Sequence, residues 1–250
     1  MTSLDPLRAR VFGANAEAYE GARPGYPSAA VDWLLPRSAT RVADVGAGTG
    51  KLTGALLARG VEVVAVEPDD GMLAVLTRLH PKTESHLGGA DALPLASRSV
   101  DAVFAAQAWH WFPHQQAVAE VRRVLRPGGW LGLVWNVEEP REPWQVELSR
   151  LDPDTGGGDV DVHRKAGGKA AISGLPEDQV EVARFPWSLA TTAAALRARL
   201  ATHSAYAVMA VPEREYLLDA AARVVDAEAA RRGTETVPLS MAAHCARWRP

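Results

Sequence analysis

Residues 41–50 read RVADVGAGTG, an apolar segment that runs directly into glycines spaced as G-x-G-x-G. The first five residues are typical of a strand buried in a parallel sheet. Glycines directly after such a strand let the backbone adopt positive φ and approach a ligand closely. Residues 51–59 (KLTGALLAR) then predict a helix closed by Gly60, whose N-terminal N–H groups suit an anion. The order strand, glycine loop, helix predicts an α/β fold with a ligand site at the loop.

The rest of the chain alternates the same two patterns. Six further strands are predicted at residues 61–66, 85–87, 100–105, 130–135, 180–189 and 236–247. Helices are predicted at residues 69–79, 113–125, 191–203 and 213–232. Asp69 or Asp70 is the expected N-cap of the first of these, and Pro127-Gly128-Gly129 is expected to end the second. Strands and helices that alternate through short connections predict a doubly wound, mostly parallel sheet of seven strands.

The composition is that of an ordinary globular protein: 250 residues, 47% hydrophobic and 23% charged, with a formal net charge of −3. This charge balance gives no reason to expect a nucleic acid as partner. No apolar run approaches the ~20 residues that span a bilayer, so no membrane segment is expected. The single cysteine, Cys245, permits no internal disulfide and fits a reducing cytoplasm. Nothing in the sequence indicates an oligomeric state.

Glu67 lies just after the second predicted strand, where a carboxylate can accept both hydroxyls of a ribose. The dinucleotide fingerprint G-x-G-x-x-G/A does not fit, because Lys51 stands where its third small residue is needed. A glycine-rich turn without a ligand is the alternative. Strand, loop, helix and carboxylate all occur in register, however, which favours a nucleotide-containing cofactor of another kind.

Five motifs occur in order along the chain: Val42–Gly50 (VADVGAGTG), Val64–Leu73 (VAVEPDDGML), Gly89–Leu95 (GADALPL), Asp101–Phe112 (DAVFAAQAWHWF) and Arg122–Asn136 (RRVLRPGGWLGLVWN). With them the chain resembles the class I S-adenosylmethionine-dependent methyltransferases. Within this class it is most similar to the small-molecule branch of trans-aconitate methyltransferase-like proteins. The resemblance implies a Rossmann-like fold with N-terminal helices and a C-terminal cap insertion. It also implies S-adenosyl-L-methionine as cofactor and S-adenosyl-L-homocysteine as product.

The chain is predicted to form one domain over residues 1–250. Its parts are a helical N-terminal lid (1–40), a cofactor-binding core (41–136), a mobile insertion (137–178) and C-terminal strands and helices (179–250). Within the insertion, residues 152–174 are rich in Gly and Asp and are interpreted as a long surface loop.

The resemblance implies three groups of cofactor-binding residues. At the methionine end these are Asp44 and the backbone of Gly46, Ala47, Gly48 and Gly50. Around the nucleoside they are Glu67 at the ribose hydroxyls, Pro68 and Asp91 at the adenine, Ala92 through its backbone, and Met72 as an apolar wall or as core. Gln107 is implied near the sulfonium, and Tyr19 and Arg23 are implied to close the N-terminal helix over the cofactor.

Methyl transfer from a sulfonium is an in-line displacement, so alignment of nucleophile, methyl and sulfur is the main task. Such alignment can supply roughly 7–11 kcal/mol. A base is needed only when the acceptor is protonated at the working pH. His110 lies after the fourth predicted strand, and a pKa near the reference value of ~6.5 would suit a base. The alternative is that His110 only positions the acceptor.

The expected acceptor is a small molecule methylated on a carboxylate or hydroxyl oxygen. Besides His110, its expected contacts are Tyr26, Trp109, Trp111 and Trp135. The chain has eight tryptophans among few aromatic residues, and we expect about half of them to border the acceptor cavity. No metal is expected: His110 and His114 are four residues apart, but Pro113 lies between them.

Two other functions remain open at this point. A nicotinamide-dependent oxidoreductase would share the glycine loop, although Lys51 and the Trp109-His110-Trp111 segment argue against it. A non-catalytic subunit that binds S-adenosylmethionine is the second alternative.

Overall fold

The computed structural model describes residues 15–153 and 172–250. They form two compact units, each assembled from separated segments. The first unit comprises residues 15–24, 137–153 and 186–242, and the second comprises 25–136, 172–185 and 243–250. Strands β5, β6 and β7 contribute residues to both units, so the single domain over residues 1–250 stays a prediction. Residues 1–14 of the predicted lid and 154–171 of the predicted insertion lie outside the described residues.

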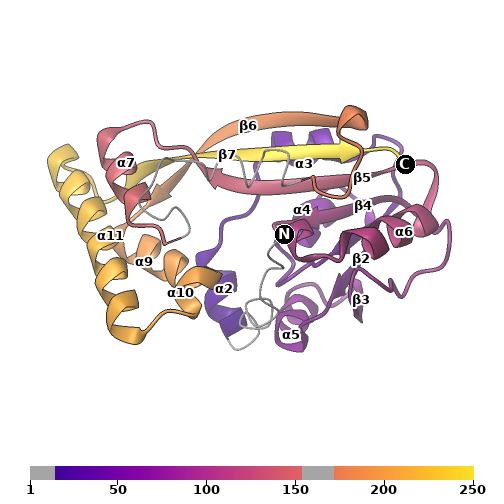
Figure 1. The fold of residues 1–250 in the computed structure, drawn as a ribbon, viewed down its shortest axis with the longest axis horizontal. Helices are drawn as coiled ribbons and strands as arrows, with labels where there is room; N and C mark the ends of the chain where they lie inside the picture. Colours follow the sequence, from indigo (N-terminus) through magenta and orange to yellow (C-terminus); the bar gives the residue numbers. More distant parts are fainter. Residues whose placement is uncertain (1–14, 154–171) are drawn as a thin grey trace. The chain divides into compact units, whose positions relative to one another are not determined.

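Seven strands form one sheet in the order β3-β2-β1-β4-β5-β7-β6, which confirms the predicted α/β sheet. The strands are β1 Arg41–Val45, β2 Glu62–Glu67, β3 Glu84–Leu87, β4 Val100–Ala106, β5 Leu125–Glu138, β6 Val180–Thr191 and β7 Val237–Trp248. The pairs β1–β2, β1–β4, β2–β3 and β4–β5 are all parallel. Figure 1 shows β7 running against its neighbours β5 and β6, so the sheet is mostly parallel but mixed.

The second unit carries the glycine loop and most of the parallel strands. Its helices are α3 Ser28–Leu34, α4 Lys51–Leu57, α5 Asp70–Leu79 and α6 His114–Val124. Both β1 and β2 are buried along almost their whole length, as expected of parallel strands covered on both faces. Val42, Val63 and Phe104 lie in one core cluster with α3 and α4. Asp69 is the N-cap of α5, as predicted, because its Oδ1 accepts a 3.0 Å bond from the Met72 N–H.

The first unit is mainly helical. Its helices are α2 Ala16–Ala22, α7 Pro143–Arg150, α9 Ala193–Ala201, α10 Ser204–Ala207 and α11 Val211–Arg232. They bury a second core cluster that includes Trp144, Leu196 and Leu218. α11 ends at Gly233, whose φ of 67° confirms the predicted helix stop.

Some elements and boundaries differ from the sequence-based expectation. Leu125 begins β5 and does not belong to α6, because its apolar spacing suits either element. Pro127-Gly128-Gly129 lies in a bulge of β5: Val100 pairs with Leu125, but Ala102 pairs with Trp130. The predicted insertion contains an unpredicted helix, α7, which is fixed by a capping box between Glu142 and Gln145. The predicted helix 191–203 ends at Ala201, and His203 caps α10 instead.

Within the described ranges, no helix has the length and apolar character needed to cross a bilayer.

Candidate functional site: the glycine loop and its carboxylates

The backbone of the glycine loop has positive φ angles, which glycine adopts more readily than other residues. Gly46 has φ +66°, and a Cβ there would lie 2.7 Å from the Ala108 Cβ, closer than atoms can pack. Gly48 has φ +57°, but a Cβ there would meet no atom within 4 Å. Gly50 has φ +93° and is the N-cap of α4. The loop therefore packs tightly at Gly46 and leaves open space beside Gly48.

The N–H groups of this loop are already used within the protein. Those of Gly46 and Ala47 donate to the Val66 carbonyl at 2.8 and 3.2 Å. That of Gly48 donates to Glu67 Oε2 at 2.8 Å. These three groups are therefore not the anion-binding donors that a glycine loop suggests.

Asp44 lies beneath the loop and is completely buried. Its Oδ2 accepts a 2.7 Å bond from the Thr53 hydroxyl, while its Oδ1 has no partner among the described residues. Burial raises the pKa of Asp44 to about 6, against a smaller lowering by the bonds from Thr53. An unpartnered buried carboxylate oxygen is costly unless a ligand satisfies it. The amino group of S-adenosylmethionine has the charge to do so, so Asp44 fits the cofactor that the sequence implies.

Glu67 at the end of β2 is 7% exposed and held by two backbone donors. Its Oε2 accepts from Gly48, and its Oε1 accepts from the Asp69 N–H at 3.0 Å. Burial raises the pKa of Glu67 to about 7, although these two bonds oppose the shift. Each carboxylate oxygen can accept a second bond, so Glu67 is both oriented and able to receive ribose hydroxyls.

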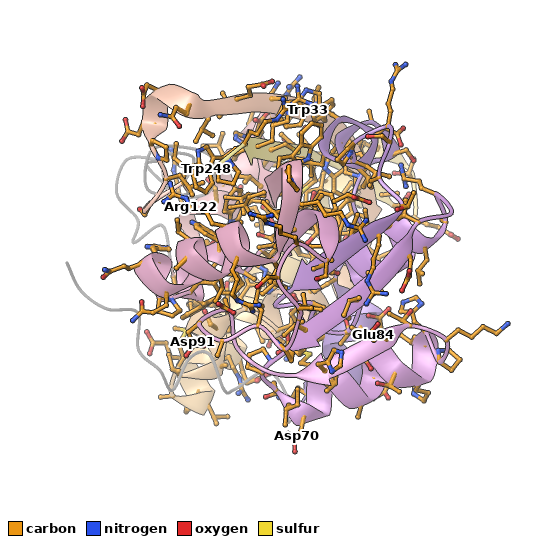
Figure 2. The ribbon with its side chains drawn as sticks, turned by 90° about the vertical axis from the view of Figure 1, so that its right-hand side faces the viewer. Trp33, Asp70, Glu84, Asp91, Arg122 and Trp248 are labelled. Carbon is orange, nitrogen blue, oxygen red and sulfur yellow. The ribbon has the colours of Figure 1, made fainter. Side chains whose placement is uncertain are left out.

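The other residues expected around the nucleoside differ in exposure. Pro68, Asp91 and Ala92 are exposed, and Figure 2 labels Asp91. The N–H of Ala92 donates to the Gly89 carbonyl at 3.4 Å. Met72 is 3% exposed, which favours the alternative that it is core. Their contacts with adenine stay predictions.

Gln107 follows β4 in a conformation that side chains rarely adopt, with φ +57°. Its N–H donates to the Val134 carbonyl at 2.8 Å, and its Nε2 donates to the Asn136 carbonyl at 3.2 Å. Asn136 was not predicted as a site residue, yet its buried Oδ1 has no partner among the described residues. The buried Thr49 hydroxyl, also unpredicted, shares this property. Thr49 lies in the loop after β1, where its position could have identified it, whereas Asn136 lies within β5 and only its unpartnered oxygen distinguishes it.

His110 lies in a short 3-10 turn, Trp109–Trp111, and is half-buried. Burial and the positive charge that His114 can carry lower the pKa of His110 to about 4. The expected pKa near 6.5 is therefore wrong, because the sequence does not show how deeply the ring is buried. A neutral imidazole at pH 7 is a weak base but a good hydrogen-bonding group.

We therefore expect His110→Gln to keep turnover within about threefold of wild type, and His110→Ala to lose about tenfold, the worth of one hydrogen bond. With cofactor saturating, the rate should show no inflection between pH 5.5 and 7.5 that depends on His110. The measurement is a pH profile of turnover for the three proteins. An acid limb near pH 6.5 that disappears in His110→Gln would identify His110 as a base instead.

Several tryptophans prove to be core residues. Trp109 is 1% exposed, and its indole N–H donates to the Ser173 carbonyl at 3.0 Å. The void that it lines measures about 10 Å³, too small for an acceptor. Trp135, Trp144 and Trp248 are also buried, and Figure 2 shows Trp248 beside Arg122, whose guanidinium lies 5.2 Å from the ring. The expectation that about half the tryptophans border the acceptor cavity stays a prediction.

Tyr26 and Trp111 remain as candidate acceptor contacts, since both are half-buried. Tyr26 packs against the core cluster of the second unit, and the Trp111 ring lies 5.0 Å from that of His110.

Tyr19 and Arg23 belong to α2 and its C-cap, in the first unit. Arg23 donates from Nε to the Thr202 hydroxyl at 2.8 Å and stacks 5.2 Å from the Tyr19 ring. A cavity of about 570 Å³ in this unit is lined by residues of α2, α9 and α11 that include Tyr19 and Thr202. The closure of Tyr19 and Arg23 over the cofactor stays a prediction.

In the part of the chain that the structure describes, no group of three His, Cys, Asp or Glu side chains is placed to hold a metal.

Comparison with known proteins also indicates a methyltransferase. Residues 43–133 match the family model described as a methyltransferase domain. An uncharacterized methyltransferase of Mycobacterium tuberculosis is 55% identical over 140 residues, which cover 56% of this chain and 58% of that protein. A malonyl-[acyl-carrier protein] O-methyltransferase of Methylococcus capsulatus is 38% identical over 130 residues, or 47% of each chain.

Among solved structures, a putative type II methyltransferase from Anaeromyxobacter dehalogenans has a TM-score of 0.68 at 27% identity, covering 90% of this chain and 96% of that one. The sequence alignments span about half the length of the curated relatives. Residues 43–133 are thus similar to a methyltransferase domain, and most of the chain is similar in fold to a solved methyltransferase structure. The narrower resemblance to trans-aconitate methyltransferase-like proteins stays a prediction.

Proposed function

We propose that this protein transfers a methyl group from S-adenosylmethionine to a carboxylate or hydroxyl oxygen of a small molecule. The observation that carries the proposal is the buried, unpartnered Oδ1 of Asp44 at the end of β1, directly before the glycine loop. This acceptor favours a cationic group, whereas the phosphates of a nicotinamide dinucleotide need N–H donors, and three of the loop's N–H groups donate within the protein. The geometry therefore favours the methyltransferase over the oxidoreductase alternative.

Each residue has a definite task in this proposal. Asp44 holds the amino group of the cofactor, and Glu67 holds its ribose. S-adenosylmethionine, when bound, supplies an electrophilic methyl group on a sulfonium. The open space beside Gly48 lets the backbone approach the ligand closely. Gln107, fixed in a strained conformation by Val134 and Asn136, is proposed to line the region of the sulfonium.

The low basicity of His110 bears on the acceptor. A carboxylate is already ionised at neutral pH and needs no base, whereas an alcohol would need a stronger one. We therefore favour a carboxylate among the two oxygens, with His110 as a hydrogen-bonding partner that orients it. The name of the Methylococcus capsulatus relative, an O-methyltransferase, is consistent with an oxygen acceptor.

The test is to incubate the protein with S-adenosylmethionine and a panel of small carboxylic acids and alcohols. Mass spectrometry then follows S-adenosylhomocysteine and the methylated product. Product with a carboxylic acid supports the proposal, and product only with amines or thiols contradicts the choice of oxygen. Cofactor binding without turnover on any acceptor class would favour the non-catalytic subunit.

Cofactor affinity should depend on pH. The raised pKa values of Asp44, about 6, and Glu67, about 7, mean that both carboxyls take up protons as the pH falls from 8 to 5.5. Bound cofactor needs both in the ionised form, so the protons must be released on binding. We expect affinity for S-adenosylhomocysteine to fall at least about tenfold between pH 8 and 5.5.

Calorimetric titrations at several pH values, in buffers of different ionisation enthalpy, measure both the affinity and the released protons. An affinity that is constant over this range, with no proton release, would contradict the roles given to Asp44 and Glu67.

A further inference from the structure

A group of basic side chains surrounds the C-terminal end of α9 in the first unit. Arg199 is only 4% exposed, although a guanidinium keeps its charge at any physiological pH. Its Nη2 pairs with a carboxylate oxygen of Glu138. The Arg23 guanidinium is held at the same helix end by the hydroxyl and the carbonyl of Thr202, at 2.8 and 3.2 Å. Two guanidinium groups and the His203 ring thus meet at one place.

Two buried nitrogens in this group lack hydrogen-bond partners among the described residues: Nε of Arg199 and Nε2 of His203. The Arg199 Nε is a donor under all conditions. A buried donor without an acceptor costs about 1–3 kcal/mol, and proteins satisfy nearly all such groups. An acceptor that belongs to a ligand would satisfy it.

The electrostatic surroundings indicate the charge of that ligand. Burial, with the positive charges of Arg23 and Arg199, holds the pKa of His203 well below its ordinary value. His203 is therefore neutral at pH 7 and can donate from Nε2 in one tautomer. Glu138 offsets the charge of Arg199 but leaves its Nε without an acceptor, and this donor beside the positive charge of Arg23 favours an oxyanion over a neutral acceptor.

We propose that Arg199 and His203 form a subsite for an anionic group, a carboxylate or phosphate, of a small-molecule ligand. The identification of this ligand with the methyl acceptor rests on the proposed function. The cavity of about 570 Å³ in the same unit offers room for the body of such a molecule, and Thr202 belongs both to its lining and to the basic group. The charged residues of that cavity lining pair with one another, Arg197 and Arg214 with Glu215, so the cavity itself supplies no free charge for the anion.

The test uses the full-length protein and nuclear magnetic resonance of its histidine rings. Sodium acetate or inorganic phosphate is titrated at constant ionic strength, with acetamide as the neutral counterpart of acetate. The His203 ring signals should shift saturably with at least one anion and should not shift with acetamide. The bound anion should also raise the pKa of His203, because it stabilises the imidazolium. The anion that binds more tightly identifies the group.

Variants locate the subsite, with the amide signals of Thr202 and Ser204 as the readout. Arg199→Gln and His203→Phe should weaken anion binding at least about tenfold, whereas His203→Gln, which keeps a donor, should retain most of it. Arg223→Gln is the control: it removes one guanidinium from an exposed position of α11 in the same unit, and Arg223 belongs neither to the cavity lining nor to the basic group. If Arg199→Gln does not fold, His203→Phe carries the comparison.

Absence of any His203 response to both anions would overturn the inference, as would an equal response to acetamide or an equal loss in Arg223→Gln. A calorimetric titration of S-adenosylhomocysteine on the same samples separates the two proposals. Cofactor binding without an anion response rejects the subsite alone. An anion response without cofactor binding leaves the subsite standing and counts against the methyltransferase.

Discussion

Asp44→Asn should weaken the binding of S-adenosylhomocysteine at least about 30-fold while leaving the protein as stable as wild type or more so. The loss follows because the variant removes the charge proposed to pair with the cofactor's amino group. Truncating one member of a buried charged pair typically costs about 2–5 kcal/mol. Asparagine keeps an oxygen that can accept the bond from Thr53, so the local structure is retained.

The direction in which Asp44→Asn changes the free energy of unfolding follows from the pKa of Asp44. The pKa of Asp44 is raised in the folded protein, so its ionised form opposes folding once the pH has risen through about 6. A shift of this size corresponds to about 3 kcal/mol at pH 8, and the neutral amide removes that cost. Calorimetry gives the affinity, and thermal unfolding at pH 8 gives the stability. A variant with wild-type affinity, or one that loses affinity only because it unfolds, would contradict the role of Asp44.

Gly48→Ala should weaken cofactor binding about 10- to 100-fold without a matching loss of stability. Without cofactor, the added methyl group meets no atom within 4 Å, and the positive φ costs about 1–2 kcal/mol. With cofactor, the methyl group takes up space that the ligand needs. Overpacking of such a contact costs about 1–3 kcal/mol.

Gly60→Ala is the control for this substitution. Gly60 also has a positive φ, +78°, and open space around its Cβ position, but it lies at the turn after α4 and outside the loop. The two variants should therefore lose similar stability in thermal unfolding, and only Gly48→Ala should lose affinity in calorimetry. Equal affinities would show that the space beside Gly48 is not where the cofactor lies.

The elements that could be predicted are those in which one local pattern decides the structure. The β-branched run before Glu67 is continuous because β2 is buried on both faces, and Asp69 caps α5 through its own side chain. Leu125 could not be assigned correctly, since its apolar side chain suits the end of a helix and the start of a strand equally. Its position is decided by its pairing with Val100, a contact between strands that sequence spacing does not show.

Some features of the candidate site could likewise be predicted from the sequence, and others could not. Glu67 could be found from its position at the end of a strand, whereas Asp44 was implied by the resemblance to a methyltransferase family. The hydrogen bonds that the loop's N–H groups donate to Val66 and Glu67 could not be predicted, because they depend on how β1 and β2 lie together. The low pKa of His110 and the burial of Trp109 depend on packing around them. Asn136 was missed because only its unpartnered oxygen sets it apart.

The most direct test of the proposed cofactor is a pair of calorimetric titrations of the wild-type protein at pH 8, one with S-adenosylhomocysteine and one with NADH. The proposal predicts saturable binding of S-adenosylhomocysteine, accompanied by proton release at lower pH, and no binding of NADH. Binding of NADH without any binding of S-adenosylhomocysteine would contradict it.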